Sequence, residues 1–164
     1  MQKHKKRLGQ HFLHDKNIIN KIISNLAINI KDTFIEIGPG EGALTTPLLE
    51  EVESITLIEK DRDLIPILEN KYNRRKVKIV NQDILKCELS NLIKENTRIV
   101  GNLPYNISTE IIFRLLPFSK DIKDLHFMLQ KEVVDRIVAA PGTKIYGRLS
   151  VMAQVYFTVK KLFN

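Results

Sequence analysis

The sequence predicts an α/β protein, a mostly parallel sheet that is doubly wound, with helices on both faces. Short runs of β-branched residues alternate with helical patterns along the chain, which is typical of parallel sheets. A glycine-rich turn at 38–42 follows the first run, and an acid, Glu59, follows the second. A strand, a glycine turn, a helix and a later acid form the nucleotide-binding unit of such sheets.

Length and composition indicate one globular domain with a basic surface. The 164 residues can bury a core, and 43% hydrophobic with 27% charged residues argues against disorder. The net charge of +7 favours a polyanionic partner such as nucleic acid over a generic basic protein. The basic run at 3–7 is either a phosphate-contacting arm or a solvated tail, and the loop at 140–148 is either a nucleic-acid contact or a connector.

Several classes of protein are excluded by composition. The single cysteine, Cys87, excludes an intrachain disulfide and a cysteine-rich metal site, and no metal ion is expected. No apolar run reaches the ~18 residues of a membrane-spanning helix. The basic N-terminus is not followed by the apolar segment of a secretory signal. We therefore expect a cytoplasmic protein without membrane contact.

Hydrophobic spacing and turn residues justify the elements in chain order. Asp15 can cap a first helix whose apolar residues recur on one face from Ile18 to Leu26. Strands are expected at 33–37, 54–58, 76–80, 97–101 and 124–129, and a further β-rich stretch at about 149–159. Helices are expected at about 43–51, 62–72, 89–94 and 108–116, with Asp61 and Asp63 capping the second of these and Ser108 the last. Pro66 lies inside 62–72, so that helix should be kinked or begin later.

Two acids stand where a nucleoside would need hydrogen-bond acceptors. Glu59 ends the second strand, about 20 residues beyond the first glycine, where an acid can accept from both ribose hydroxyls. Asp83 follows the third strand and could accept from an exocyclic adenine amine, although an ordinary turn residue is an equal alternative. In the turn after the first strand, the backbone of Gly38 and Gly40 can approach a ligand closely.

The fourth strand leads into Asn102, Leu103, Pro104 and Tyr105, which suit a flat base that carries an amino group. The adenine N6 amine is a poor nucleophile because its lone pair is delocalised into the ring. The Asn102 oxygen and a backbone carbonyl of Leu103 or Pro104 could accept its hydrogens and favour a pyramidal nitrogen. The Tyr105 ring offers stacking worth about 1–3 kcal/mol per base. The alternative, a proline turn with a packed tyrosine, is disfavoured at the carboxyl end of a parallel strand.

Taken together, these motifs resemble the ribosomal RNA adenine-N6 dimethyltransferases, the KsgA and Erm group of the Rossmann-like class I S-adenosylmethionine-dependent methyltransferases. The resemblance covers residues 7–163. It rests on Gly-Gln-His-Phe-Leu at 9–13, Glu-Ile-Gly-Pro-Gly-Glu-Gly at 36–42, Asn-Gln-Asp at 81–83 and Asn-Leu-Pro-Tyr at 102–105. Leu103 and the run at 146–150 resemble the KsgA branch, which modifies small-subunit rRNA, whereas Erm enzymes modify large-subunit rRNA.

The resemblance implies a reaction and a cofactor. The reaction is N6,N6-dimethylation of two adjacent adenosines near the 3′ end of small-subunit (16S) rRNA, as part of ribosome biogenesis, with S-adenosylmethionine as the methyl donor. His11 and Leu13 would close over the methionine end of the cofactor, and Gly38 would line it. The family often has asparagine where this chain has His11.

It also implies roles for the acids and for the aromatic motif. Glu59 would hold the ribose, and Asp83 with the Ile84 backbone would hold the adenine. Asn102 would contact both the cofactor and the target amine, and Tyr105 would stack on the target base. The site therefore needs no strong general base, because the attacked nitrogen becomes acidic once it is alkylated.

The resemblance further indicates that residues 1–164 form a catalytic domain without the family's C-terminal helical RNA-binding domain. Family members continue for about another hundred residues, the size of an added domain. The missing part would include an antiparallel strand between the fifth and sixth strands. We therefore expect a monomer with an exposed sheet edge, which could fray or pair with another chain.

Two other functions remain as alternatives to an rRNA methyltransferase of either branch. A nicotinamide-dependent oxidoreductase shares the glycine turn and the acid, but it has no use for Asn-Leu-Pro-Tyr after the fourth strand. A ribosome-assembly factor with vestigial catalysis would bind RNA without transferring methyl groups. The intact cofactor motifs argue against that second alternative.

Overall fold

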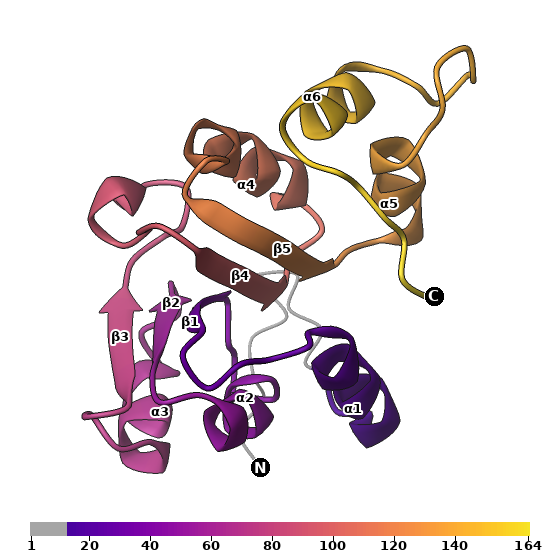
Figure 1. Cartoon of the computed structure of the whole chain (residues 1–164). Helices are drawn as coiled ribbons and strands as arrows, with labels where there is room; N and C mark the ends of the chain where they lie inside the picture. The colour runs from indigo at the N-terminus through magenta and orange to yellow at the C-terminus, as the bar shows by residue number, and fades with distance from the viewer. Residues whose placement is uncertain (1–12) are drawn as a thin grey trace.

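Five parallel strands form one sheet in the order β3-β2-β1-β4-β5 in the computed structural model, which describes residues 13–164 (Figure 1). The strands are β1 (Thr33–Ile37), β2 (Ile55–Glu59), β3 (Val77–Asn81), β4 (Thr97–Asn102) and β5 (Ile122–Met128). All four neighbouring pairs are parallel. From β1 the chain adds β2 and β3 on one side of the sheet, and then β4 and β5 on the other side. Ligands of such sheets bind at this switch point, between β1 and β4.

Helices cover both faces of the sheet, as the sequence predicts. They are α1 (Lys16–Asn25), α2 (Thr45–Glu51), α3 (Ile65–Lys71), α4 (Ser108–Leu115), α5 (Lys131–Ile137) and α6 (Arg148–Tyr156), with short 3-10 turns η2 (Leu89–Asn91) and η3 (Leu116–Phe118). One core joins the sheet to α2 and α3 through Leu48 and Leu68. A second core joins the opposite face to α4 through Ile111 and Leu115. Within residues 13–164, no helix is long and apolar enough to cross a membrane.

The strands are buried because both of their faces carry apolar side chains. Phe34 packs in the core that contains α2 and α3, while its neighbour Ile35 packs in the core that contains α4. Both side chains are almost completely buried. Burying a side chain of this size contributes about 1.5–3 kcal/mol. Because successive residues point to opposite faces, a continuous apolar run predicts a central parallel strand, and β1 confirms this.

The starts of α1, α3 and α4 can be compared with the N-caps that the sequence predicts. Asp15 caps α1 as predicted, and its carboxylate accepts from Asn17 N at 2.8 Å. Pro66 lies in the first turn of α3, so the later start is confirmed and there is no kink. The predicted caps of α3 are wrong, because Asp61 Oδ1 accepts from Asp63 N in the preceding turn instead. Ser108 is likewise no cap; it begins α4 after Ile107 and donates to Tyr105 O.

The C-terminal part differs most from the sequence prediction. The β-rich stretch expected at 149–159 is wrong, because residues Arg148–Tyr156 form α6. Leu149 and Ala153 are buried one helical turn apart, and Leu149 packs against Ile112 and Leu116 near α4. Ser150 is buried as well, so the buried positions follow one helical face, whereas a strand would turn Ser150 to the face opposite Leu149. Residues 157–164 form no regular element, so within the described residues β5 is an edge strand. The helix predicted at 89–94 is also reduced to the turn η2.

Candidate active site

A cavity of about 510 Å³ lies beyond the carboxyl ends of β1, β4 and β5. Its volume is typical of small-molecule and cofactor sites. Seven sequence-predicted site residues line it: Leu13, Gly38, Gly40, Asn102, Leu103, Pro104 and Tyr105. The fold therefore brings the glycine turn and the Asn-Leu-Pro-Tyr motif, which are some sixty residues apart in the sequence, to one cavity. His11 lies outside the described residues.

The glycine turn owes its shape to three positive φ angles. Gly38, Gly40 and Gly42 have φ of 65°, 59° and 85°, a region that other residues rarely adopt. Gly42 has a second constraint, since a side chain there would overlap the hydroxyl of Tyr72. That hydroxyl donates to Gly42 O at 3.1 Å and contacts Thr46 Oγ1 at 2.7 Å. Residue Tyr72 follows α3, so α3 holds the glycine turn from the side.

Glu36 is a buried acid in the cavity wall. Thr45, at the start of α2, donates from Oγ1 to Glu36 Oε2 at 2.6 Å. Burial, together with the nearby negative charge of Glu59, raises the pKa of Glu36 to about 7, although the Thr45 hydrogen bond acts in the opposite direction. A carboxylate held here is suited to a cationic group of a ligand, because the cavity already provides its desolvation.

Glu59 is buried behind the glycine turn and does not line the cavity itself. Gly40 N donates to Glu59 Oε2 at 3.2 Å, and Asp61 N donates to Glu59 Oε1 at 2.8 Å. A further backbone hydrogen bond, from Lys60, also reaches this carboxylate. The two carboxylate oxygens together have about four acceptor sites, so acceptor capacity remains for a ribose hydroxyl. Burial raises the pKa of Glu59.

Asp83 lies further along the same edge, also outside the cavity. Lys60 Nζ contacts Asp83 Oδ2 at 2.7 Å, and Leu85 N donates to Asp83 Oδ1 at 3.0 Å. The Lys60 ammonium lowers the pKa of Asp83. Asn81 ties this turn to the end of β2, since its Nδ2 donates to Glu59 O at 2.9 Å.

Ile84 follows Asp83 directly and is buried. Its side chain packs in the core beside β4 and α4. That packing leaves only its backbone to face a ligand at this edge. Glu59, Asp83 and Ile84 thus form a second group of predicted residues, outside the cavity. The hydrogen bond from Gly40 N to Glu59 connects this group to a residue that lines the cavity.

The Asn-Leu-Pro-Tyr motif is held by the end of β4. Leu103 is buried, and its N donates to Met128 O at 3.2 Å, which fixes the motif against β5. Pro104 O accepts from Ile107 N at 3.2 Å as the chain turns into α4. Tyr105 keeps 48% of its surface exposed at the mouth of the cavity. Aromatic rings at nucleic-acid sites commonly stack with a base.

Several lining residues were not assigned by the sequence. Glu36 stands inside the glycine motif, so its position at the end of the first strand was a usable signal. Lys71 and Gln130 also line the cavity. Lys71 is the last residue of α3 and Gln130 follows β5. No local pattern in the sequence indicates that these segments reach the glycine turn or the motif at 102–105.

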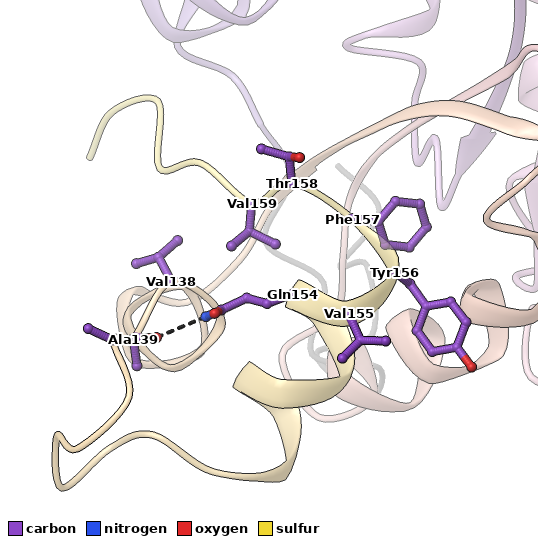
Figure 2. Close-up of a pocket in the computed structure, with 9 residues that line it drawn as sticks. Val138, Ala139, Gln154, Val155, Tyr156, Phe157, Thr158 and Val159 are labelled. Carbon is purple, nitrogen blue, oxygen red and sulfur yellow. Dashed lines mark hydrogen bonds between the residues drawn. The ribbon is translucent and has the colours of Figure 1, made fainter.

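A second cavity, of about 480 Å³, lies between the end of α5 and α6 (Figure 2). None of the sequence-predicted site residues lines it. Gln154 crosses it, and its Nε2 donates to Ala139 O at 2.8 Å and to Ile137 O at 2.9 Å. Val138, Val155 and Phe157 also line it, although the surface exposed to this cavity is mainly polar. The cavity at the strand ends is the candidate site because the predicted residues converge on it.

The strand order, the glycine turn and the acids along one sheet edge place the chain in the Rossmann-like fold of the class I methyltransferases. Solved structures share this fold. A dimethyladenosine transferase from Plasmodium falciparum is 29% identical with a TM-score of 0.78, and the match covers 88% of this chain and 52% of that one. The 23S rRNA methyltransferase ErmE is 28% identical with a TM-score of 0.70, covering 87% and 55%.

Within that class, the chain belongs to the ribosomal RNA adenine dimethylase family, whose sequence model matches residues 1–164. Curated relatives are named ribosomal RNA small subunit methyltransferase A. The one from Hahella chejuensis is 48% identical over 163 residues, and the one from Coxiella burnetii (strain RSA 493 / Nine Mile phase I) is 50% identical over 162. Each match covers 98% of this chain but only 60% and 63% of the relative. The chain thus spans about three fifths of the length of these relatives.

Proposed function

We propose that residues 1–164 form the cofactor-binding and catalytic domain of an S-adenosylmethionine-dependent rRNA adenine-N6,N6-dimethyltransferase. Its substrate is a pair of adjacent adenosines near the 3′ end of small-subunit rRNA, and its setting is the cytoplasm, where small subunits are assembled. The observation that carries the proposal is that one cavity is lined by both the glycine turn and Asn102–Tyr105. The curated relatives support the small subunit over the large one.

The residues present fit such a cofactor from end to end. Glu59 offers acceptors for the ribose hydroxyls, and Asp83 offers one for the adenine amine. Gly38 and Gly40 allow close backbone approach, while the acid Glu36 lies in the wall for the amino-acid end. The bound cofactor would supply an electrophilic methyl group for adenine N6. The sulfonium would become a neutral thioether, and the methylated nitrogen would release its proton to solvent.

The chain's own part in the reaction is to position the target amine and to polarise it. The Asn102 side-chain oxygen and a backbone carbonyl of the motif accept the two N6 hydrogens, which directs the nitrogen lone pair toward the cofactor end of the cavity. Tyr105 stacks on the base and excludes water from one face. Catalysis of this kind depends on orientation and electrostatics rather than on a strong base.

Calorimetric titration tests the cofactor. We expect saturable binding of S-adenosylmethionine to the protein and none of NADH, which would instead bind to a nicotinamide-dependent oxidoreductase. Binding of NADH alone would overturn the proposal. Binding of neither would favour the assembly factor with vestigial catalysis.

A methyl-transfer assay tests the substrate. Small ribosomal subunits that lack the modification should accept two methyl groups on each of two adenosines from labelled cofactor. Protein-free large-subunit rRNA is the matched comparison, because Erm-type enzymes act on it. Preferential labelling of the large-subunit rRNA would replace the proposed substrate with the Erm-type one.

The oligomeric state belongs to the same proposal. We propose a monomer, with β5 as a sheet edge to which another strand could be added. Light scattering over a range of protein concentration measures this, and a constant mass equal to one chain supports it.

A further inference from the structure

Lys71 reaches the glycine turn from α3, a helix that the sequence does not associate with the site. It is the last residue of α3, and its Nζ donates to Glu41 O at 2.9 Å. The ammonium group lies beside the Tyr72 ring, 5.3 Å from the ring centroid. These contacts fix the charge at the turn, and Lys71 lines the cavity together with Glu36 and Gly38.

The charges of the cavity wall make this lysine distinctive. Among the described lining residues, the ionisable side chains are His14, Glu36, Glu41, Lys71 and Tyr105. Lys71 is the only lysine or arginine among them. Its field reaches the buried Glu36 carboxyl, whose pKa is raised mainly by burial and is lowered in part by Lys71. The wall therefore offers both an acid and a cation to the same end of a ligand.

A zwitterionic amino-acid group needs that pair. An α-ammonium group is suited to an acid such as Glu36, while the α-carboxylate of the same ligand is repelled by that acid and is suited to a cation. A lysine ammonium has three N–H donors, and one of them is used by Glu41 O. The other two can be directed at a ligand without breaking that bond.

We propose that Lys71 binds the α-carboxylate of the cofactor's amino-acid end and so selects a carboxylated cofactor. The inference rests on the proposed function, because it takes S-adenosylmethionine as the ligand. Lys71 acts here as a binding residue, and its charge is the property that matters. An arginine at this position would keep the charge, whereas a methionine would keep most of the side-chain length and remove it.

A structural role must be separated from this binding role, because Lys71 also holds the turn. Tyr72 provides the matched control: its hydroxyl donates to Gly42 O at 3.1 Å, the carbonyl next to the one that Lys71 holds. Tyr72→Phe removes a turn contact without changing charge. Lys76→Met removes a positive charge from an exposed lysine that does not line the cavity.

The experiment is a calorimetric titration with two ligands, S-adenosylhomocysteine and its decarboxylated analogue S-adenosyl-3-thiopropylamine. We expect Lys71→Met to weaken binding of S-adenosylhomocysteine by about fivefold to tenfold, the range of a charged hydrogen bond at an exposed site. Binding of the decarboxylated analogue should be unchanged, and Lys71→Arg should restore most of the loss. Tyr72→Phe should affect both ligands equally, and Lys76→Met neither.

Two results would overturn the inference while leaving the proposed function intact. Equal loss for both ligands in Lys71→Met would show that the lysine only supports the turn. No loss for either ligand would show that the carboxylate binds elsewhere. If the unmodified protein bound neither ligand, the proposed function itself would fail, so the two failures are distinguishable.

Discussion

Thr45 Oγ1 donates a 2.6 Å hydrogen bond to Glu36 Oε2, and both side chains are buried. Thr45 begins α2 and Glu36 lies in β1, so this bond fixes the start of the helix against the end of the strand on either side of the glycine turn. Both ends of the glycine turn are therefore joined through one buried acid, Glu36.

The pH dependence of stability should follow from Glu36. Its pKa is raised from 4.5 to about 7 in the folded protein, so the folded state holds the proton more tightly than the unfolded chain does. The stabilisation is complete below pH 4.5 and is lost as pH rises to about 7, a change of about 3 kcal/mol. Glu36→Gln keeps an acceptor for Thr45 and should remove this dependence of the free energy of unfolding on pH. The variant should therefore be the more stable protein at pH 8.

Urea unfolding at pH 5 and pH 8 measures the free energy of unfolding, with exposed Glu50→Gln as control. Equal slopes in Glu36→Gln and the unmodified protein would contradict it.

Replacing Glu59 should weaken cofactor binding. In Glu59→Gln one oxygen becomes an amide nitrogen, which cannot accept from Gly40 N, Asp61 N or a ribose hydroxyl. We expect the affinity for S-adenosylmethionine to fall by about tenfold or more, since a hydrogen bond to a charged group contributes about 1.5–3 kcal/mol. Calorimetry measures the change, and Glu53→Gln, an exposed acid just before β2, is the control. Unchanged affinity in Glu59→Gln would remove the ribose role.

Asn102 is expected to be essential for methyl transfer. Asn102→Ala deletes the oxygen proposed to accept from the target amine, and loss of one such preorganised group costs about 10²- to 10³-fold in rate. RNA affinity should stay the same, because the contact is to one base. Single-turnover transfer and filter binding report the two quantities separately. Asn106→Ala, at an exposed position four residues later, should leave both unchanged; transfer at the normal rate by Asn102→Ala would refute the assignment.

Arg98 should be a major contributor to stability at the opposite end of the strands. Its side chain is 3% exposed and contacts Asp32 at 2.6 Å and Asp124 at 2.9 Å. Arg98→Met removes the buried cation that the two acids share and leaves Asp32 with Lys123 alone, which costs about 3–5 kcal/mol. Lys123→Met is the control, because that lysine contacts Asp32 at 2.8 Å but is 45% exposed, and it should cost less than about 1 kcal/mol. Denaturant unfolding at pH 7 compares the two variants, and equal costs would contradict the prediction.

Acid should weaken the same network. Although burial acts to raise it, hydrogen bonds from Lys123, Asn29 N and Arg98 lower the pKa of Asp32 to about 2. The folded state then binds the proton less tightly than the unfolded chain, whose value is 3.8. This stabilisation is present above pH 4 and is lost as pH falls toward 2. In Asp32→Asn the loss between pH 4 and pH 2 should be smaller than in the unmodified protein, as measured by thermal unfolding.

The parallel sheet could be predicted because each central strand carries its own signal. The run at 33–37 is apolar on both faces and leads into glycines, so its strand, its burial and its turn are all local properties. The prediction failed at α6, where short β-branched and aromatic residues suggested a strand. There the packing of Leu149 and Met152 in the cluster with Ile112 decided the structure, and such packing can override local propensity.

The sequence by itself determined the sheet, the family motifs and the chemical character of the residues at 36–42, 59, 83 and 102–105, because strand patterns and glycine turns are encoded locally. Only the tertiary structure decided that Lys71 meets the glycine turn and that Thr45 holds Glu36. It also decided that Arg98 is surrounded by Asp32 and Asp124. These contacts join elements from distant parts of the chain, and their geometry depends on how helices pack across the sheet, which no short window of sequence specifies.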